Sequence, residues 1–207
     1  MGSITLIGTG NMARAIGTLA VAGGNTVEVM GRDQSKADDL AKALGGSTTT
    51  GRWGAVPAGD IVITALLADG VVPVVAEYGD ALAGKVIVEI SNPFNSAADG
   101  LALPEGTSIA QEVAKAAPAS ASVVKAFNTI FGVVLAKGRP LDVFIAGDDA
   151  QAKAVVGEFI ESLELRPLDV GGLNMAHWLE GTGLVMMGLA RHGVKNFDFA
   201  LGAAVPG

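Results

Sequence analysis

The sequence contains no cysteine, which excludes disulfide bonds, catalytic thiols and thiolate metal ligands. Histidine is scarce as well: His177 and His192 are the two examples among 207 residues, so we expect no zinc site and no other bound metal. No apolar run reaches the length of a membrane-spanning helix, and no basic segment precedes an apolar stretch near Met1, as it would in a secretory signal. These absences predict a cytoplasmic protein that binds no membrane.

Charged residues are few, at 17% of the chain, and acidic residues outnumber basic ones to give a net charge of −7. An excess of negative charge disfavours binding to nucleic acids and to anionic lipid surfaces. Half of the residues are hydrophobic, which excludes an intrinsically disordered chain, and 207 residues suffice for the core of one large domain. We therefore expect a globular protein whose ligands are small molecules.

Glycine is abundant, with 29 residues, and the most informative glycines lie near the start of the chain. An apolar strand predicted at 3–7 runs into Gly8-Thr9-Gly10-Asn11-Met12-Ala13, and a helical pattern follows from Ala15. In this G-x-G-x-x-A pattern Gly8 allows a tight turn, Gly10 lets a pyrophosphate approach the backbone and Ala13 allows close helix packing. A glycine-rich turn without a ligand is the alternative, and the strand–loop–helix context favours a dinucleotide site.

Strand and helix patterns alternate along the rest of the chain. Strands are predicted at 3–7, 26–30, 47–50, 61–65, 85–90, 122–126, 142–146 and 165–169, and helices at 35–44, 52–56, 71–78, 108–117, 150–163 and 175–189. Such alternation predicts an α/β fold of the Rossmann type, with a doubly wound, mostly parallel sheet. We expect one domain over 1–207, with a core at about 1–147 and a small C-terminal extension at about 148–207 that includes a capping helix.

The residues after the second strand bear on the choice between NAD and NADP. In this fold an acidic residue there binds the ribose 2′-hydroxyl, whereas a basic residue accommodates the 2′-phosphate of NADP. Arg32 offers a guanidinium that can bind a phosphate with two hydrogen bonds, and Lys36 adds a positive charge one helical turn later. Asp33 would repel the phosphate if it pointed inward, but we expect it to cap the following helix. NADP is favoured, with solvated surface charges as the alternative for the two cations.

Six motifs, in this order, resemble those of the F420-dependent NADP oxidoreductase family. They are Gly8–Met12, Gly31-Arg32 with Lys36, Ser91–Pro93, Lys125–Thr129, Gly147–Asp149 and Leu165–Gly171. The resemblance covers nearly the whole chain and implies an N-terminal Rossmann fold with a small C-terminal extension. It also implies hydride transfer between NADP(H) and the deazaflavin coenzyme F420, which would be a co-substrate.

The resemblance also implies roles for particular residues. After the turn at Gly8, the residues Thr9, Gly10, Asn11 and Met12 would hold the pyrophosphate; Arg32 and Lys36 would bind the 2′-phosphate; Leu66 would contact the middle of the dinucleotide; and Asn92, Asn128 and Gly132 would lie near the nicotinamide. The deazaflavin would stack on the nicotinamide in a cleft closed by the C-terminal part. Because two rings held face to face exchange a hydride without a metal or a protein nucleophile, no catalytic residue is predicted.

Three residues depart from the family pattern. Gly31 lacks the hydroxyl of the serine that often precedes the arginine, Leu67 stands where many members have proline, and His177 stands where an arginine is expected. The last two leave the second substrate open. An NADPH-dependent reductase of a flavin or a ferric chelate is one alternative, and an NADP(H) sensor without turnover is another. Too few residues follow the sixth strand for the long helical substrate domain of β-hydroxyacid and imine reductases, so those activities are not expected.

Several other residues have more than one interpretation. His177 is either a proton donor near the cleft or a helix residue satisfied by a backbone carbonyl, and Lys125 is either functional or a lysine that reaches to solvent. Asp148-Asp149 is expected to stabilise a helix N-terminus. Trp178 and Met186-Met187 are expected to pack in the core or against a second copy, with a cofactor wall as the alternative. Their apolar, glycine-bearing helix favours a homodimer.

Overall fold

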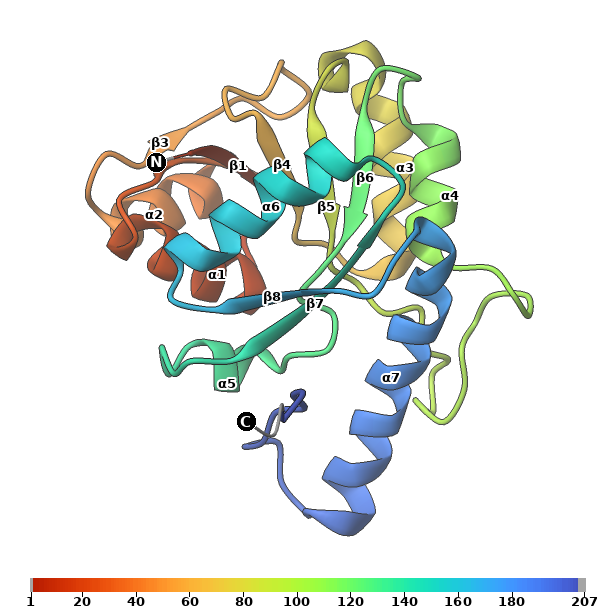
Figure 1. Ribbon diagram of the computed structural model, residues 1–207. Helices are drawn as coiled ribbons and strands as arrows, with labels where there is room; N and C mark the ends of the chain where they lie inside the picture. Colours follow the sequence, from red (N-terminus) through yellow and green to blue (C-terminus); the bar gives the residue numbers. More distant parts are fainter. Residues whose placement is uncertain (1, 205–207) are drawn as a thin grey trace.

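The structure is a computed structural model that describes residues 2–204, and its body is an eight-stranded sheet with helices on both faces (Figure 1). The strands are β1 (Ser3–Ile7), β2 (Thr26–Met30), β3 (Thr49–Thr50), β4 (Ile61–Thr64), β5 (Val86–Glu89), β6 (Ser122–Lys125), β7 (Asp142–Gly147) and β8 (Arg166–Asp169). The α-helices are α1 (Asn11–Ala22), α2 (Gln34–Leu44), α3 (Ala68–Tyr78), α4 (Ile109–Ala116), α5 (Gly132–Leu135), α6 (Ala150–Ser162) and α7 (Ala176–Gly188). Within residues 2–204, none of the helices has the length and apolar character needed to cross a bilayer.

The strand order is β3-β2-β1-β4-β5-β6-β7-β8, so the chain winds outward from β1 in one direction and then returns to add β4 on its other side. In such sheets the reversal leaves a crevice beyond the carboxyl ends of the two central strands. Neighbouring strands are parallel except β6 and β7, which pair antiparallel through Val124 with Gly147 and Lys125 with Ala146. The predicted Rossmann-type, mostly parallel fold is confirmed.

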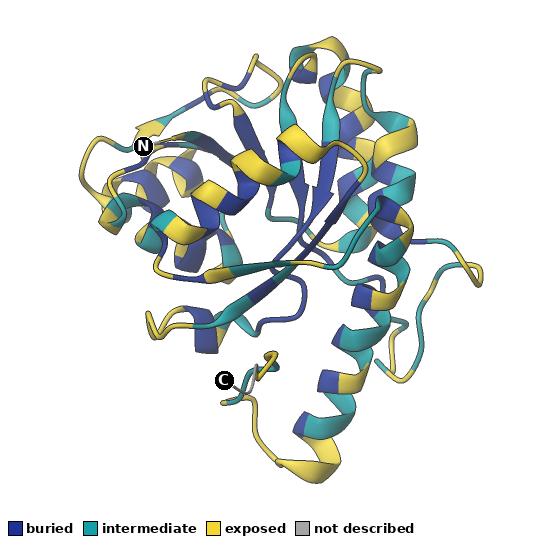
Figure 2. Cartoon of the chain, viewed as in Figure 1, coloured by how far each residue is buried: buried dark blue, intermediate teal, exposed yellow. Residues whose placement is uncertain are grey.

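Two layers of helices bury the apolar strands, as the dark interior of Figure 2 shows. Strands β1, β4 and β5 read as continuous apolar runs because both of their faces are covered. One face packs on α1, α2 and α6, and the other packs on α3 and α4. Because helices pack on both faces of the central strands, the loops that follow these strands start from fixed positions.

Two local predictions are wrong, and one helix is missed. The segment 52–56 is a turn-rich loop rather than a short helix, because Gly54 has a positive φ of 76° that no α-helix contains. The strand predicted at 47–50 is reduced to Thr49–Thr50. Helix α5 has four residues, which is too short for an apolar periodicity to be recognised.

The last helix, α7, contains three glycines, and close packing compensates for one of them. A Cβ atom on Gly183 would lie 2.8 Å from the side-chain oxygen of Asn92, so the missing side chain lets the helix approach the loop after β5. Gly181 and Gly188 have no such neighbour within 4 Å. Beyond α7 the chain continues as one π-helical segment, Leu189–Gly193.

Candidate functional site

The loop between β1 and α1 has the geometry of a phosphate-binding turn. Gly8 has a φ of 126°, and a Cβ atom there would lie 2.3 Å from the carbonyl oxygen of Ala65, so glycine is required. Gly10 is the N-cap of α1 and has no side chain to accept from the first N–H groups of the helix. A Cβ atom on Gly10 would meet nothing within 4 Å, so this side of the loop is open. Open space in front of an uncapped helix N-terminus fits a pyrophosphate.

The turn between β2 and α2 presents two cations. The carboxylate of Asp33 accepts a hydrogen bond of 3.2 Å from the backbone N–H of Lys36, which confirms the predicted cap of α2. The Lys36 ammonium lies 3.8 Å from the same carboxylate, and both side chains are more than half exposed. Arg32 is exposed, and its guanidinium carbon lies 5.2 Å from the ring centroid of Trp53. The basic groups therefore border the open side of the glycine loop.

Gly31, where the family pattern often has serine, lies against the side chain of Thr9. A Cβ atom on Gly31 would lie 3.0 Å from the side-chain methyl of Thr9, which is closer than most real Cβ contacts. A side chain at this position would require the Thr9 methyl group to move by a few tenths of an ångström.

Three adjoining clefts run along the carboxyl edge of the sheet. The first, of about 430 Å³, lies between the loop at Gly8–Gly10, Arg32 and Leu66. The second, of about 350 Å³, shares Gly10 and Leu66 with the first and extends to Asn92. The third, of about 200 Å³, shares Met12 and Asn92 with the second and reaches α5 and α7. The crevice expected at the reversal of strand order is therefore a continuous path.

Every residue predicted to bind a cofactor lines this path. Gly8, Thr9, Gly10, Arg32, Lys36 and Leu66 line the first cleft; Asn11, Met12 and Asn92 join the second; Asn128 and Gly132 line the third. The structure thus brings together residues from five separate segments, each of which follows a strand. Their individual contacts with a cofactor stay predictions.

A fourth cleft, of about 570 Å³, adjoins the third and shares Met12 and Gly132 with it. Its walls are mostly apolar, and Phe197 from the C-terminal tail forms part of them. The ring of Phe197 meets that of Phe131 edge to face at 5.1 Å between centroids. The tail therefore borders a second apolar space next to the end of the path.

Two asparagines form part of the wall of the third cleft and contact α7, which also lines it. The amide of Asn92 donates to the Asn128 carbonyl at 2.8 Å, and the Asn128 amide donates to the side-chain oxygen of Asn92 at 2.9 Å. The Asn128 amide also donates to the Leu179 carbonyl at 2.8 Å. These bonds fix both side chains against the helix.

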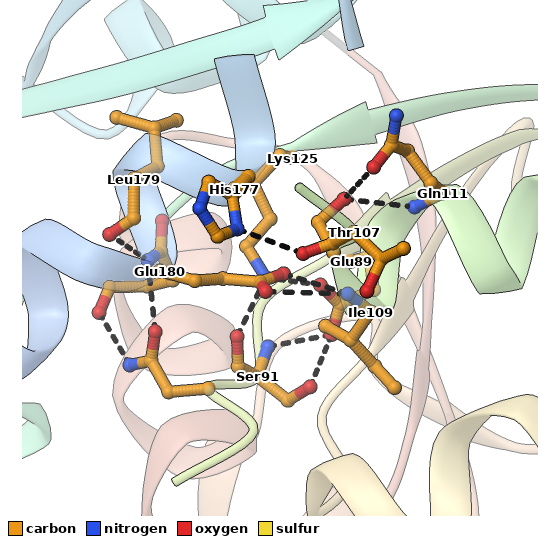
Figure 3. Close-up of polar contacts among 12 residues, drawn as sticks. Glu89, Ser91, Thr107, Ile109, Gln111, Lys125, His177, Leu179 and Glu180 are labelled. Atoms are coloured by element: carbon orange, nitrogen blue, oxygen red, sulfur yellow. Dashed lines mark hydrogen bonds and ion pairs between the residues drawn. The ribbon is translucent and has the colours of Figure 1, made fainter. Parts of the chain in front are cut away.

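Behind this wall lies a buried group of charges that sequence reasoning missed, which we call the charged triad: Glu89, Lys125 and Glu180 (Figure 3). All three side chains are fully buried. The Lys125 ammonium donates to the Glu89 carboxylate, to Glu180 at 2.8 Å and to the Ser91 carbonyl at 2.6 Å. A lysine that reaches to solvent is therefore the wrong interpretation of Lys125.

Glu180 also binds the start of α4, because its two carboxylate oxygens lie 3.0 and 3.2 Å from the backbone N–H of Ile109. Burial raises the pKa of Glu180 above its ordinary value, and the neighbouring Lys125 charge counteracts part of that rise. One sequence signal could have revealed the triad. Glu89 and Glu180 are each a single acid within an otherwise apolar strand or helix segment.

The remaining ambiguous residues are placed as follows. His177 has its Nδ1 atom 2.8 Å from the Thr107 carbonyl, so that nitrogen donates and the interpretation as a satisfied helix residue is confirmed. Asp149 caps α6 by accepting from the backbone N–H groups of residues 151 and 152, as predicted, and these bonds lower its pKa. Trp178 is 64% exposed and therefore not a core residue, whereas Met186 is buried and lines the third cleft.

The comparisons with known proteins agree with this geometry. Residues 3–93 match the sequence model of the family described as NADP oxidoreductase, coenzyme F420-dependent. Metalloreductase STEAP3 of Rattus norvegicus is 31% identical over 188 residues, and the F420-dependent NADP reductase of Methanocaldococcus jannaschii is 28% identical over 139 residues. The alignments cover 89% and 63% of this chain but only 37% and 62% of the two relatives.

A solved structure has nearly the same fold over its whole length. It is a candidate F420-dependent NADP reductase from Arthrobacter sp. FB24, with a TM-score of 0.86 and a sequence identity of 23%. The match covers 99% of this chain and all of the other. At that identity it supports the fold and leaves the substrates to be argued from the site.

Proposed function

The chain belongs to the F420-dependent NADP oxidoreductase family, and from this premise we propose that it transfers a hydride between NADP(H) and the deazaflavin coenzyme F420. One observation carries the proposal: the path of three clefts begins at two unburied cations and ends beside a separate apolar cleft. A dinucleotide bound along the path would bring its reactive ring next to the space for a second ring.

The first part of the path suits the phosphates of NADP(H). Gly10 leaves room in front of the uncapped N-terminus of α1, whose N–H groups and dipole attract a pyrophosphate. Arg32 and Lys36 supply the positive charge that a 2′-phosphate requires. The residues present therefore fit the phosphates of NADP(H), the cofactor of the family.

The inner part of the path suits ring-to-ring transfer. NADPH supplies the hydride when it is bound. Met12, Asn92 and Gly132 would orient its ring, while Phe131 and Met186 provide apolar walls that exclude water. Two rings held in a dry cleft exchange a hydride directly, and the proton that the reduced deazaflavin takes up comes from solvent. The chain's contribution is therefore binding and orientation.

The test uses the purified chain with NADPH and oxidised F420. We expect the visible absorbance of F420 to fall as NADPH is consumed. In parallel, Arg32→Ala should weaken NADPH binding about tenfold or more, since hydrogen bonds to charged groups contribute about 1.5–3 kcal/mol, while NADH binding changes little. Clear NADPH binding without F420 turnover would refute the choice of acceptor and leave the cofactor site standing.

A second candidate function rests on the resemblance to the rat metalloreductase. In this alternative the same NADPH site reduces a ferric chelate or a flavin. Replacing F420 with each acceptor in the same assay separates the candidates, because rapid turnover with one of them identifies it. Tight NADPH binding without turnover of any of the three would favour a sensor.

We also propose that α7 packs against a second copy of the chain. Trp178 and Val185 are 64% and 59% exposed on a helix that is apolar around its circumference, and such a helix is usually buried. A homodimer by light scattering, converted to a monomer by Val185→Glu, is the expected result. A wild-type monomer at micromolar concentration would contradict it.

A further inference from the structure

We propose that Trp53 is a positioning residue for the 2′-phosphate end of the cofactor: its indole ring holds the guanidinium of Arg32 at the first cleft and thereby raises the preference for NADPH over NADH. The inference rests on the proposed NADP site and adds a residue that neither the glycine loop nor the basic turn contains. Trp53 lies in the loop between β3 and β4, in the segment predicted as a helix.

The contact itself is a cation–π interaction. The Arg32 guanidinium carbon lies 5.2 Å from the Trp53 ring centroid, within the range of about 6 Å over which an aromatic face attracts a cation. Both residues line the first cleft together with Lys36. Within residues 2–204 no carboxylate lies at ion-pair distance from Arg32, so the ring is the interaction partner of its charge.

The ring is fixed from two sides. Its indole N–H donates to the Glu77 carboxylate on α3 at 2.7 Å. Its edge meets Tyr78 at 5.4 Å between centroids and an interplanar angle of 82°. Tyr78 is buried, and its hydroxyl lies 3.5 Å from the sulfur of Met30, at the end of β2. The ring is thus attached to the same strand end from which Arg32 projects.

An aromatic partner suits an arginine that must bind a phosphate. A carboxylate partner would neutralise the guanidinium and use its N–H groups, whereas a ring face uses none of the five donors. The ring also restricts a long, exposed side chain before the ligand arrives, which reduces the entropy lost on binding. The gain in affinity applies to NADPH alone, because NADH lacks the 2′-phosphate that Arg32 would bind.

Three variants at Trp53 test this role. Trp53→Leu keeps apolar bulk but removes the ring, and Trp53→Phe keeps a ring face without the indole N–H. We expect Trp53→Leu and Trp53→Ala to weaken NADPH binding about two- to fivefold, the range for an exposed cation–π contact, with NADH binding unchanged. Trp53→Phe should retain most of the NADPH affinity. Calorimetric titration of both nucleotides measures the ratio directly.

A double-mutant comparison tests whether Trp53 acts through Arg32. Once Arg32 is alanine, a further Trp53→Leu change should leave NADPH affinity unaltered. Equal losses for NADPH and NADH, or an additive loss in the double variant, would overturn the inference. If Trp53→Ala fails to fold, the Leu and Phe variants decide the question. A wild type that binds neither nucleotide would instead refute the proposed cofactor site.

Fluorescence gives an independent measurement. The chain has two tryptophans, so Trp178→Phe leaves Trp53 as the single indole. Titration of this variant with NADP⁺ should change the Trp53 emission in step with the calorimetric affinity, since the ring borders the ligand site. Binding that leaves the emission unchanged would remove Trp53 from the site.

Discussion

The two ends of the path of clefts treat charge in opposite ways. At the first cleft, Arg32 and Lys36 are exposed and retain donors that a ligand can use. Behind the third cleft, Lys125 is fully buried, and its three N–H donors are taken by Glu89, Glu180 and the Ser91 carbonyl. An ammonium has only three donors, so Lys125 has none left for a ligand. The exposed cations are therefore available to a ligand, whereas the buried one joins elements of the fold.

The charged triad joins three elements that are far apart in the chain. Glu89 ends β5, Lys125 ends β6 and Glu180 belongs to α7. Its neighbours in sequence, Ser91 and Leu179, lie next to the asparagine wall of the third cleft. The triad thus attaches α7 to the sheet where the nicotinamide ring is proposed to lie. Four predictions test this contrast between the two ends.

The largest effect is expected for Lys125→Met, which leaves two buried carboxylates without a counter-charge. Removal of one partner from a buried ion pair costs about 3–5 kcal/mol of unfolding free energy. Urea unfolding measures it. Lys115→Met is the matched control, because the exposed Lys115 is paired at 2.7 Å with Glu112 on the surface and its loss should cost less than about 1 kcal/mol. Equal losses of unfolding free energy for the two lysine variants would contradict the expected difference between a buried and an exposed charge.

Glu180→Gln should cost less than Lys125→Met, because the remaining Lys125 and Glu89 charges balance. Burial raises the pKa of Glu180, so the folded state holds its proton more tightly than the unfolded state, whose pKa is near 4.5. The stability from that proton is present below pH 4.5 and is lost as pH rises through the folded-state pKa. Relative to wild type, the Gln variant should therefore gain stability as the pH rises above 4.5 and through the folded-state pKa of Glu180. Parallel pH curves from urea unfolding would contradict the assignment.

Gly10→Ala should leave the fold nearly intact and weaken the binding of NADPH at the first cleft. The added Cβ meets no protein atom within 4 Å, so the stability change should stay below about 1 kcal/mol. NADPH affinity should fall at least tenfold, about 1.4 kcal/mol, because the methyl group occupies the pyrophosphate approach. Gly8→Ala is the comparison: its Cβ would lie 2.3 Å from the Ala65 carbonyl oxygen, so unfolding free energy should fall as well.

The smallest effect is expected for Lys36→Met, whose charge is exposed and partly balanced by Asp33. NADPH affinity should fall about two- to fivefold, in line with a pair energy of up to about 1 kcal/mol, and NADH affinity should stay constant. Added salt should reduce the difference between wild type and variant because it screens exposed charges. A difference that salt leaves unchanged would indicate that Lys36 acts by another route.

Local physics explains what could be predicted. Gly8, Gly10 and the caps at Asp33 and Asp149 depend on residues a few positions away, so their conformations can be inferred from spacing and residue type. The same reasoning failed at 52–56, where one left-handed glycine interrupts an otherwise helical pattern. Tertiary pairings were also inaccessible, such as the antiparallel contact of β6 with β7.

The sequence by itself determined the strand–loop–helix phosphate turn, the basic turn after β2 and the alternation that builds the Rossmann-type sheet. Only the tertiary structure decided which charges are free. Arg32 meets a ring 21 positions away, and Lys125 meets carboxylates 36 and 55 positions away. The reason is physical, because the burial and pairing of a charge depend on surroundings that the folded chain creates. A lysine can contact a ligand or join elements of the fold, according to those surroundings.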